Sequence, residues 1–273
     1  MPLNLTDHPP RSLLYVPASN PRALEKAVGL PADMVMIDLE DAVPADRKAE
    51  ARGAMRAAVR AGFPGKVVAV RVNGAGTAAQ ADDLVALAGL GVDALVVPKV
   101  DRIVMLDAAA ALGLPLLAMV ETPTGVFAAQ AIAADPRVAG LIAGLNDLAH
   151  ELHLPPGHDR AAMVMAIQTI VLAARAAGKL AFDGVWNAID DVPGFEAEAA
   201  DARRQGFDGK TLIHPAQVAP CNRIFGPSEA DIAAARALVA AATGGAQRYD
   251  GAMVEDMHVA AARRLLSRID GTR

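Results

Sequence analysis

Two acidic residues stand where apolar segments of the sequence end, and their chemistry favours a metal site. Glu121 lies at the end of segment 115–122, and Asp147 follows segment 138–145. These carboxylates have no Cys or paired His nearby and suit a hard cation, so we expect Mg²⁺ bound by few protein ligands and several waters, with Mn²⁺ as a substitute. The alternative is that one carboxylate pairs with Arg71 or Lys99 and that no metal binds.

Three more acids occur within four residues, in the sequence IDLED. Alternation along a strand places Asp38 and Glu40 on the same side, opposite Leu39. Glu40 and Asp41 come nearest the end of the segment, and we expect them to hold metal-bound waters or to orient basic neighbours. The structural alternative is that they form salt bridges to the basic residues of the next helix start, Arg47, Lys48 and Arg52.

Two basic residues occupy similar positions at the ends of further segments. Arg71, in VRVN, is expected to bind a substrate carboxylate through two parallel hydrogen bonds, a geometry that Lys reproduces poorly. Lys99, in VVPK, could be a Schiff-base nucleophile, an anion binder or a partner of the acids. With so many carboxylates expected nearby, Lys99 should stay charged, which argues against a Schiff base.

These side chains can meet only if the segment ends converge, and the alternation of segments predicts a (β/α)8 TIM barrel. Short apolar or β-branched runs alternate with Ala-rich helical stretches, which is typical of parallel βα units. We expect strands at residues 12–18, 34–41, 67–73, 94–100, 115–122, 138–145, 179–187 and 210–215. Helices are expected at residues 21–28, 46–61, 77–88, 123–133 and 161–177, among others.

The polar residues gather at the carboxyl ends of these strands, which is where barrel enzymes build their active sites. The structural alternative is an open doubly wound sheet. Such a sheet usually carries a Gly-rich phosphate turn after its first strand, whereas this sequence has YVPASNP there. We therefore expect residues 1–226 to form a catalytic barrel and residues 227–273 to form a C-terminal helical extension.

Composition and charge exclude several classes of function. The net charge is −5, both signs are mixed along the chain, and no basic block indicates nucleic-acid binding. No apolar run reaches the roughly 18 residues of a membrane span, and the start of the chain lacks the features of a signal peptide, so we expect a cytoplasmic protein. The single Cys221 excludes an internal disulfide and is expected to serve in packing.

The motifs at the strand ends resemble those of one known family. They are LLYVPASNPRALEKA, MIDLEDAVPADRKAEAR, VRVNGAGT, VVPKV, VETPTG, LIAGLNDLAHEL and LIHPAQV, in this order. Their types and order resemble the citrate lyase beta-subunit-like (CitE-like) branch of the HpcH/HpaI aldolase/citrate lyase family. The resemblance extends over nearly the whole chain, from about Arg11 to Leu266.

The resemblance implies a Mg²⁺-dependent carbon-carbon lyase that acts on a 3-hydroxyacyl-CoA thioester of the malyl-CoA, citramalyl-CoA or citryl-CoA type. It implies partners of two kinds, a CoA thioester and a small 2-hydroxy or 2-oxo acid, and a homotrimer in which a lid is exchanged between subunits. It assigns metal binding to Glu121 and Asp147, substrate binding to Arg71, and the acids near the metal waters to Glu40 and Asp41. The segment GAMVEDMH resembles the lid, in which Glu255 would exchange a proton.

Two departures from the family pattern leave other functions open. Asn146 stands where relatives often have Glu, and Glu255 stands where they often have Asp, on a side chain one methylene longer. A shift on the order of 1 Å can be severe for catalysis. The alternatives are a CoA-independent 2-oxo-acid aldolase, an acyl-CoA thioesterase, and a subunit that is non-catalytic or needs partner chains.

Overall fold

The computed structural model describes residues 8–157 and 160–270 of the chain. Residues 1–7, where the sequence predicts no signal peptide, lie outside the described part. The chain divides into two compact units, Met1–Phe225 and Gly226–Arg273, and each is described by itself.

The first unit is a closed barrel of eight parallel strands, as the sequence predicts. Pairing of the first strand with the last, with Ser12 opposite Lys210, closes the ring and excludes the open doubly wound sheet. Every predicted strand is present, although most end two to four residues earlier than expected, because the chain turns toward the next helix at the site residues. The strands are β1 (Ser12–Pro17), β2 (Met34–Asp38), β3 (Val67–Arg71), β4 (Ala94–Val97), β5 (Leu116–Val120), β6 (Val138–Ala143), β7 (Leu180–Asp183) and β8 (Gly209–Leu212).

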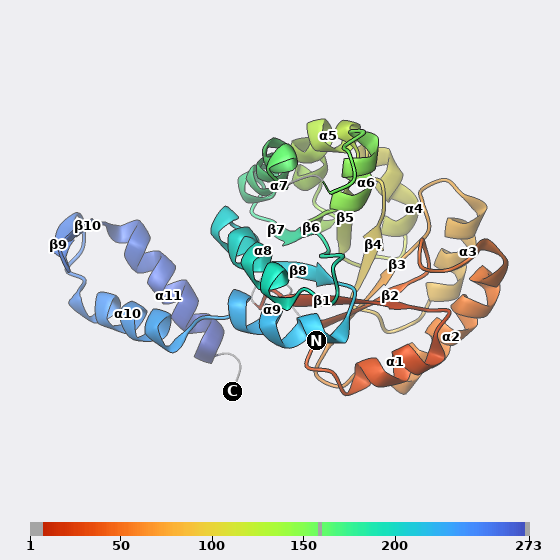
Figure 1. Ribbon diagram of the computed structural model, residues 1–273, viewed down its shortest axis with the longest axis horizontal. Helices are drawn as coiled ribbons and strands as arrows, with labels where there is room; N and C mark the ends of the chain where they lie inside the picture. The colour runs from red at the N-terminus through yellow and green to blue at the C-terminus, as the bar shows by residue number, and fades with distance from the viewer. Residues whose placement is uncertain (1–7, 158–159, 271–273) are drawn as a thin grey trace. The chain divides into compact units, whose positions relative to one another are not determined.

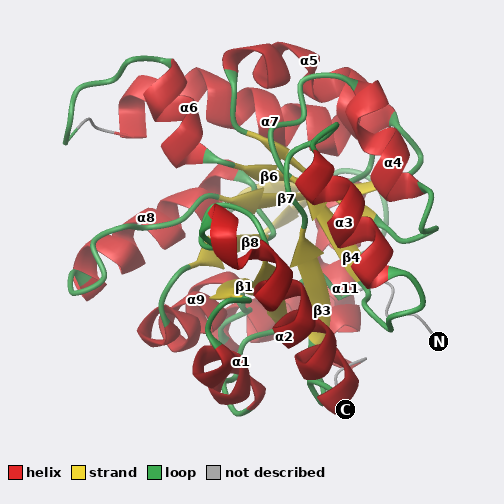
Figure 2. Cartoon of the chain, turned by 90° about the vertical axis from the view of Figure 1, so that its right-hand side faces the viewer, coloured by secondary structure: helices red, strands yellow, loops and turns green. Residues whose placement is uncertain are grey.

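Helices surround this ring of strands (Figures 1 and 2). They are α1 (Pro21–Val28), α2 (Lys48–Ala61), α3 (Ala78–Leu87), α4 (Asp107–Ala110), α5 (Pro123–Ala134), α6 (Leu145–Glu151), α7 (Val164–Ala176), α8 (Val192–Gln205) and α9 (Val218–Phe225). Short 3₁₀ turns precede α2, α4, α7 and α9, at Ala45–Arg47, Ile103–Leu106, Arg160–Met163 and Pro215–Gln217. None of the helices in the described ranges has the length and apolarity that a membrane crossing requires.

Several helices on the functional side begin with the same local device, a capping side chain followed by proline. Asn20 accepts a hydrogen bond from the backbone N–H of Ala23 at the start of α1, with Pro21 as the first helical residue. Thr122 and Pro123 repeat this arrangement at the start of α5. Such residues satisfy backbone donors at the helix start and fix where the helix begins. The strand-to-helix turns therefore hold the adjacent site residues in place.

Alternation along the strands separates two apolar clusters. One lies inside the barrel and includes Leu13, Met36, Ala69, Met119 and Phe182. The larger cluster lies between the strands and the helices. Because side chains alternate, the residues two positions beyond the inner ones continue the inward-facing rows at the carboxyl ends of the strands. These inward positions include Tyr15 after Leu13, and Asp38 after Met36.

A buried ion network joins the last two strands to the helices outside them. Asp183 lies between Arg160 (Nη2 to Oδ1, 2.7 Å) and Lys210 (Nζ to Oδ2, 2.6 Å), and Lys210 also contacts Glu198 of α8 at 2.6 Å. The side chains of Asp183 and Lys210 are 0% exposed. Burial by itself would raise the pKa of Asp183, but the two cations lower it below its usual range. The network ties β7, β8, α8 and the turn before α7 together.

The second unit consists of α10 (Glu229–Ala241), α11 (Asp256–Asp270) and a small hairpin formed by β9 (Gln247–Tyr249) and β10 (Ala252–Val254). The sequence analysis expected a helical extension here, which agrees with the two helices, but it did not expect the hairpin. Asp250 and Gly251 form its two-residue loop, both with positive φ (50° and 79°). Asp-Gly is a favoured pair for such loops, so the sequence carried a signal that the helical reading of this region missed.

Asp183→Asn should destabilise the barrel by up to about 3–5 kcal/mol, because Arg160 and the fully buried Lys210 would lose the buried carboxylate between them and share only Glu198 among the described carboxylates. The free energy of unfolding, measured by urea titration at pH 7, tests this. Glu50→Gln is the matched control: it removes an exposed contact with Arg47 and should leave the unfolding midpoint unchanged. Equal midpoints for the two variants would contradict the importance of the network.

Candidate active site

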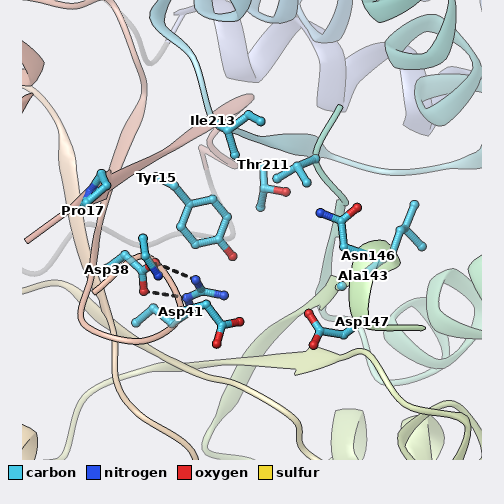
Figure 3. Close-up of a pocket in the computed structure, with 14 residues that line it drawn as sticks. Tyr15, Pro17, Asp38, Asp41, Ala143, Asn146, Asp147, Thr211 and Ile213 are labelled. Atoms are coloured by element: carbon cyan, nitrogen blue, oxygen red, sulfur yellow. Dashed lines mark hydrogen bonds and ion pairs between the residues drawn. The ribbon is translucent and has the colours of Figure 1, made fainter. Parts of the chain in front are cut away.

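A cavity of about 350 Å³ opens at the carboxyl ends of the strands (Figure 3). Charged and hydroxyl side chains from several strands line it, together with the turn that follows β6. The lining residues are Tyr15, Pro17, Asp38, Asp41, Ala42, Arg71, Ala143, Gly144, Leu145, Asn146, Asp147, Val185, Thr211 and Ile213. The cavity is therefore at the end of the barrel where the sequence predicted the site.

Arg71 is held by an acid of the neighbouring strand, Asp38. The guanidinium donates from Nε to Asp38 Oδ1 (2.8 Å) and from Nη2 to Oδ2 (2.6 Å). It also lies over the ring of Tyr15, 4.7 Å from the centroid. Burial alone would lower the pKa of Arg71, but the hydrogen bonds to Asp38 raise it, so the guanidinium stays charged. The sequence predicted that Arg71 would make two parallel hydrogen bonds to a substrate carboxylate. In the structure Nε and Nη2 make such a pair of bonds to Asp38, and Nη1 is left for other contacts.

Glu40 is a buried carboxylate beside two cations. Its oxygens lie 3.0 Å from Arg71 Nη1 and 3.7 Å from Lys99 Nζ. Burial raises the pKa of Glu40 to about 7, although Arg71 opposes the shift. Despite the short distance to Arg71, Oε2 accepts no hydrogen bond from any described group. Glu40 therefore exchanges its proton near neutral pH and retains an unused acceptor.

The salt bridges that were the structural alternative for Glu40 and Asp41 do not form. The nearby cations have other partners: Arg47 contacts Glu50, Arg52 contacts Asp82 and Asp83, and Lys48 donates to the carbonyl oxygens of Leu39 and Glu40. Lys48 thereby holds the backbone of the IDLED turn, while Asp41 is exposed and lines the cavity.

Glu121 is buried at the end of β5, at 1% exposure, and the backbone around it is shaped to its carboxylate. Its Oε1 accepts the backbone N–H of Lys99 at 2.6 Å. A Cβ atom at Gly144 would collide with Cβ and Oε2 of Glu121, so only glycine fits there. Burial, followed by the charge of Asp147, raises the pKa of Glu121 to about 8. The backbone of Lys99 and Gly144 therefore fixes where the Glu121 carboxylate lies.

Lys99 connects the two acids through different parts of the same residue. Its backbone N–H holds Glu121, and its Nζ lies 3.4 Å from Asp147 Oδ1. Lys99 has φ of 52°, in the left-handed region, where a non-glycine residue is strained. Burial lowers the pKa of Lys99, but the surrounding carboxylates outweigh burial and raise it, so the amine stays charged. A charged amine is no Schiff-base nucleophile.

The carboxylates of Glu121 and Asp147 suit a divalent cation. Glu121 follows β5, and Asp147 lies in the first turn of α6, just after the neighbouring strand β6. A cation bound by both carboxylates would offset burial and the charge of Asp147, which raise the pKa of Glu121. Within the described ranges no group of three or more His, Cys, Asp or Glu is placed to hold a metal. A site with two protein carboxylates and several waters therefore fits Mg²⁺, which loses its waters reluctantly.

The remaining predicted residue, Glu255, belongs to the C-terminal unit. It lies between β10 and α11, where its backbone N–H donates to His258 Nδ1 at 3.0 Å. Sequence reasoning missed two residues that line the cavity, Tyr15 and Thr211. It also missed Asn187, which exchanges two amide hydrogen bonds with the lining residue Asn146. Alternation in the first strand could have indicated Tyr15, because it comes two residues after the inward-facing Leu13 and therefore also faces inward.

The raised pKa of Glu40 should make stability depend on pH. Folding raises this pKa from 4.5 to about 7, so between these values the folded chain binds the extra proton and the free energy of unfolding falls as pH rises. Glu40→Gln should flatten that fall by up to about 1.4 kcal/mol per pH unit. Urea unfolding at pH 5, 6 and 7 in EDTA measures the slope. The exposed Glu25→Gln is the control, and an unchanged slope in Glu40→Gln would contradict the assignment.

Comparisons with known proteins identify the family of this barrel. A model of the HpcH/HpaI aldolase/citrate lyase family matches residues 11–215. A (3S)-malyl-CoA thioesterase of Cereibacter sphaeroides is 45% identical over 273 residues, 96% of this chain and 95% of that protein. A citrate lyase subunit beta-like protein of Deinococcus radiodurans is 38% identical over 277 residues, 94% of this chain and 96% of that protein.

A solved structure agrees with these relatives. The protein CitE of Mycobacterium tuberculosis, in complex with magnesium, acetoacetate and coenzyme A, superposes with a TM-score of 0.82 at 34% identity, over 95% of this chain and 98% of that chain. The resemblance of the strand-end motifs is thereby confirmed, and the chain belongs to the HpcH/HpaI aldolase/citrate lyase family.

Proposed function

We propose that this chain is a Mg²⁺-dependent enzyme of malyl-CoA-type thioesters and that its net reaction is hydrolysis of the thioester. The observation that carries the proposal is the placement of a carboxylate pair, Glu121 and Asp147, beside the same cavity as Arg71. The magnesium and coenzyme A bound by CitE support this choice of cofactor and substrate class. The relative that shares 45% of its residues with this chain is a thioesterase, which favours hydrolysis over cleavage of a carbon-carbon bond.

Glu121 and Asp147 would hold the metal, with Gly144 and the Lys99 N–H keeping the Glu121 carboxylate in place. When bound, Mg²⁺ would act as a Lewis acid toward the oxygens of the acyl group. A cavity of about 350 Å³ takes the small acid part of the substrate and leaves the nucleotide part of coenzyme A outside. Lys99 would offset the negative charge that gathers when an anionic acid meets several carboxylates.

Hydrolysis requires a base for the attacking water, and Glu40 has the right properties. Its pKa of about 7 leaves it partly ionised at neutral pH, and its Oε2 has no hydrogen-bond donor among the described groups. Water adds to the thioester carbonyl carbon while Glu40 takes one of its protons. The carbon-sulfur bond then breaks, and Glu40 returns this proton to the leaving thiolate of coenzyme A. Arg71 Nη1 stabilises negative charge on the substrate, and Asp41 orients waters at the rim.

The second candidate is the carbon-carbon lyase that the sequence motifs imply, and the citrate lyase beta-like relative favours it. In this reaction a carboxylate of the site, with Glu40 as the candidate, takes the hydroxyl proton of the acid fragment. The carbon-carbon bond breaks, and protonated Glu255 gives a proton to the thioester methyl carbon. Glu255 would serve the site from a neighbouring subunit of a homotrimer. The trimer and the exchanged lid rest on the resemblance of GAMVEDMH, and so does the role of Glu255.

The products formed from (3S)-malyl-CoA distinguish these reactions. We expect purified protein with Mg²⁺ to release free coenzyme A and malate in equal amounts, as resolved by mass spectrometry, and EDTA to abolish the release. Acetyl-CoA with glyoxylate would establish the lyase instead. Binding without turnover would favour a non-catalytic or partner-dependent subunit, and indifference to every thioester would favour an aldolase of free 2-oxo acids.

Glu121→Gln should remove metal binding because it replaces an anionic ligand with a neutral amide. Titration of Mn²⁺, followed by electron paramagnetic resonance, should show at least a tenfold weaker affinity and no Mg²⁺-dependent turnover. Gly144→Ala should have a similar effect without touching a ligand, since its new Cβ would displace the Glu121 carboxylate. The control is Asp107→Asn, which changes an exposed partner of Arg137 and should leave Mn²⁺ affinity unchanged. Wild-type Mn²⁺ affinity in Glu121→Gln would refute the metal assignment.

A further inference from the structure

Among the described residues that line the cavity, several side-chain donors already have partners. The Nε and Nη2 atoms of Arg71 are committed to Asp38, and Nη1 lies 3.0 Å from Glu40 Oε2 without donating a hydrogen bond to it. The hydroxyl of Thr211 donates to the carbonyl oxygen of Asp183 at 2.9 Å, and the amide of Asn146 is paired with Asn187. A substrate carboxylate therefore needs a donor beyond the paired edge of Arg71.

Tyr15 supplies such a donor. Its ring lies against the guanidinium of Arg71, and its hydroxyl points into the cavity (Figure 3). The hydroxyl donates to the sulfur of Met119 at 3.6 Å, and Arg71 Nη1 is directed at the same sulfur at 4.0 Å. A thioether is a weak acceptor. Two donors of different residues thus converge on one weak acceptor, and a carboxylate oxygen is a stronger acceptor for both.

Among the described residues, the only hydrogen bond of the Tyr15 hydroxyl goes to the weakly accepting sulfur of Met119. Packing against Arg71 and the inner cluster would be served equally by a phenylalanine ring, which has no polar atom to desolvate. Burial raises the pKa of Tyr15, and the nearby acids add to the shift although Arg71 opposes it. The phenol therefore keeps its proton over the physiological range and can donate to an anion without adding charge.

We propose that Tyr15 is a substrate-contacting residue, whose hydroxyl and Arg71 Nη1 together bind one oxygen of the free carboxylate of the acyl group. This inference rests on the proposed function, since it requires a substrate with an anionic acid part. It makes Tyr15 a determinant of specificity: an acyl group that lacks the carboxylate offers no acceptor to this pair.

The test compares wild type with Tyr15→Phe on two substrates, (3S)-malyl-CoA and 3-hydroxybutyryl-CoA, which lacks the free carboxylate. A hydrogen bond to a charged group is worth about 1.5–3 kcal/mol, so kcat/KM for malyl-CoA should fall on the order of tenfold to a hundredfold. The value for 3-hydroxybutyryl-CoA should stay within about twofold. The affinity for free malate with Mg²⁺, measured by calorimetry, should fall by a similar factor, while Mn²⁺ affinity and melting temperature stay unchanged.

Two control variants separate a substrate contact from a structural role. Met119→Leu removes the sulfur and keeps the hydroxyl, so malate should bind at least as tightly as in wild type. Tyr249→Phe changes the other tyrosine of the chain, in β9, and should have no effect on malate binding.

Each other outcome refutes a distinct claim. Equal losses on both substrates, or a lower melting temperature that accounts for the loss, would overturn the carboxylate contact. Unchanged malate binding in Tyr15→Phe would overturn the inference and leave the proposed function intact. A wild-type protein that neither binds malate nor turns over malyl-CoA would overturn the proposed function, and the role of Tyr15 with it.

Discussion

The ion pair between Asp38 and Arg71 is the interaction on which the rest of the site depends. It places a full positive charge inside the mouth of the barrel, where the neighbouring groups are mostly acidic. That charge opposes the effect of burial on Glu40 and Glu121, and the guanidinium also supports the ring of Tyr15. A buried guanidinium needs a partner such as Asp38, because an unpaired buried charge is strongly destabilising. The pair holds Arg71 in one orientation and leaves Nη1 directed into the site.

The fold could be predicted from the sequence because its signals repeat. Eight apolar segments, each followed by a helical stretch, leave few topologies open, and polar residues at the segment ends show which end of the barrel is functional. The hairpin of β9 and β10 was missed because its strands are only three residues long. Its Asp250-Gly251 loop was present in the sequence, but strands this short carry no clear alternation.

The sequence could predict which residues face the site more readily than which of them contact each other. Periodicity indicates that Asp38, Arg71 and Glu121 face the same mouth, but it does not show which acid Arg71 binds. In the structure Arg71 forms paired hydrogen bonds with Asp38, whereas the sequence analysis expected such bonds with a substrate carboxylate. Tyr15 escaped notice because an aromatic residue in a strand usually serves in packing. Its contacts with Arg71 and with the sulfur of Met119 become visible only in the structure. Contacts between strands depend on register and rotamers, which a single sequence does not express.

Lys99 contacts Glu121 through its backbone and Asp147 through its side chain. These two contacts can therefore change separately during evolution. The peptide group that holds Glu121 depends on the left-handed backbone, whereas the amine near Asp147 depends on side-chain chemistry. A lineage could lose the amine, and with it the local charge, while the peptide group continued to fix Glu121. The position of Glu121 and the charge beside Asp147 can therefore change independently, although both depend on residue 99.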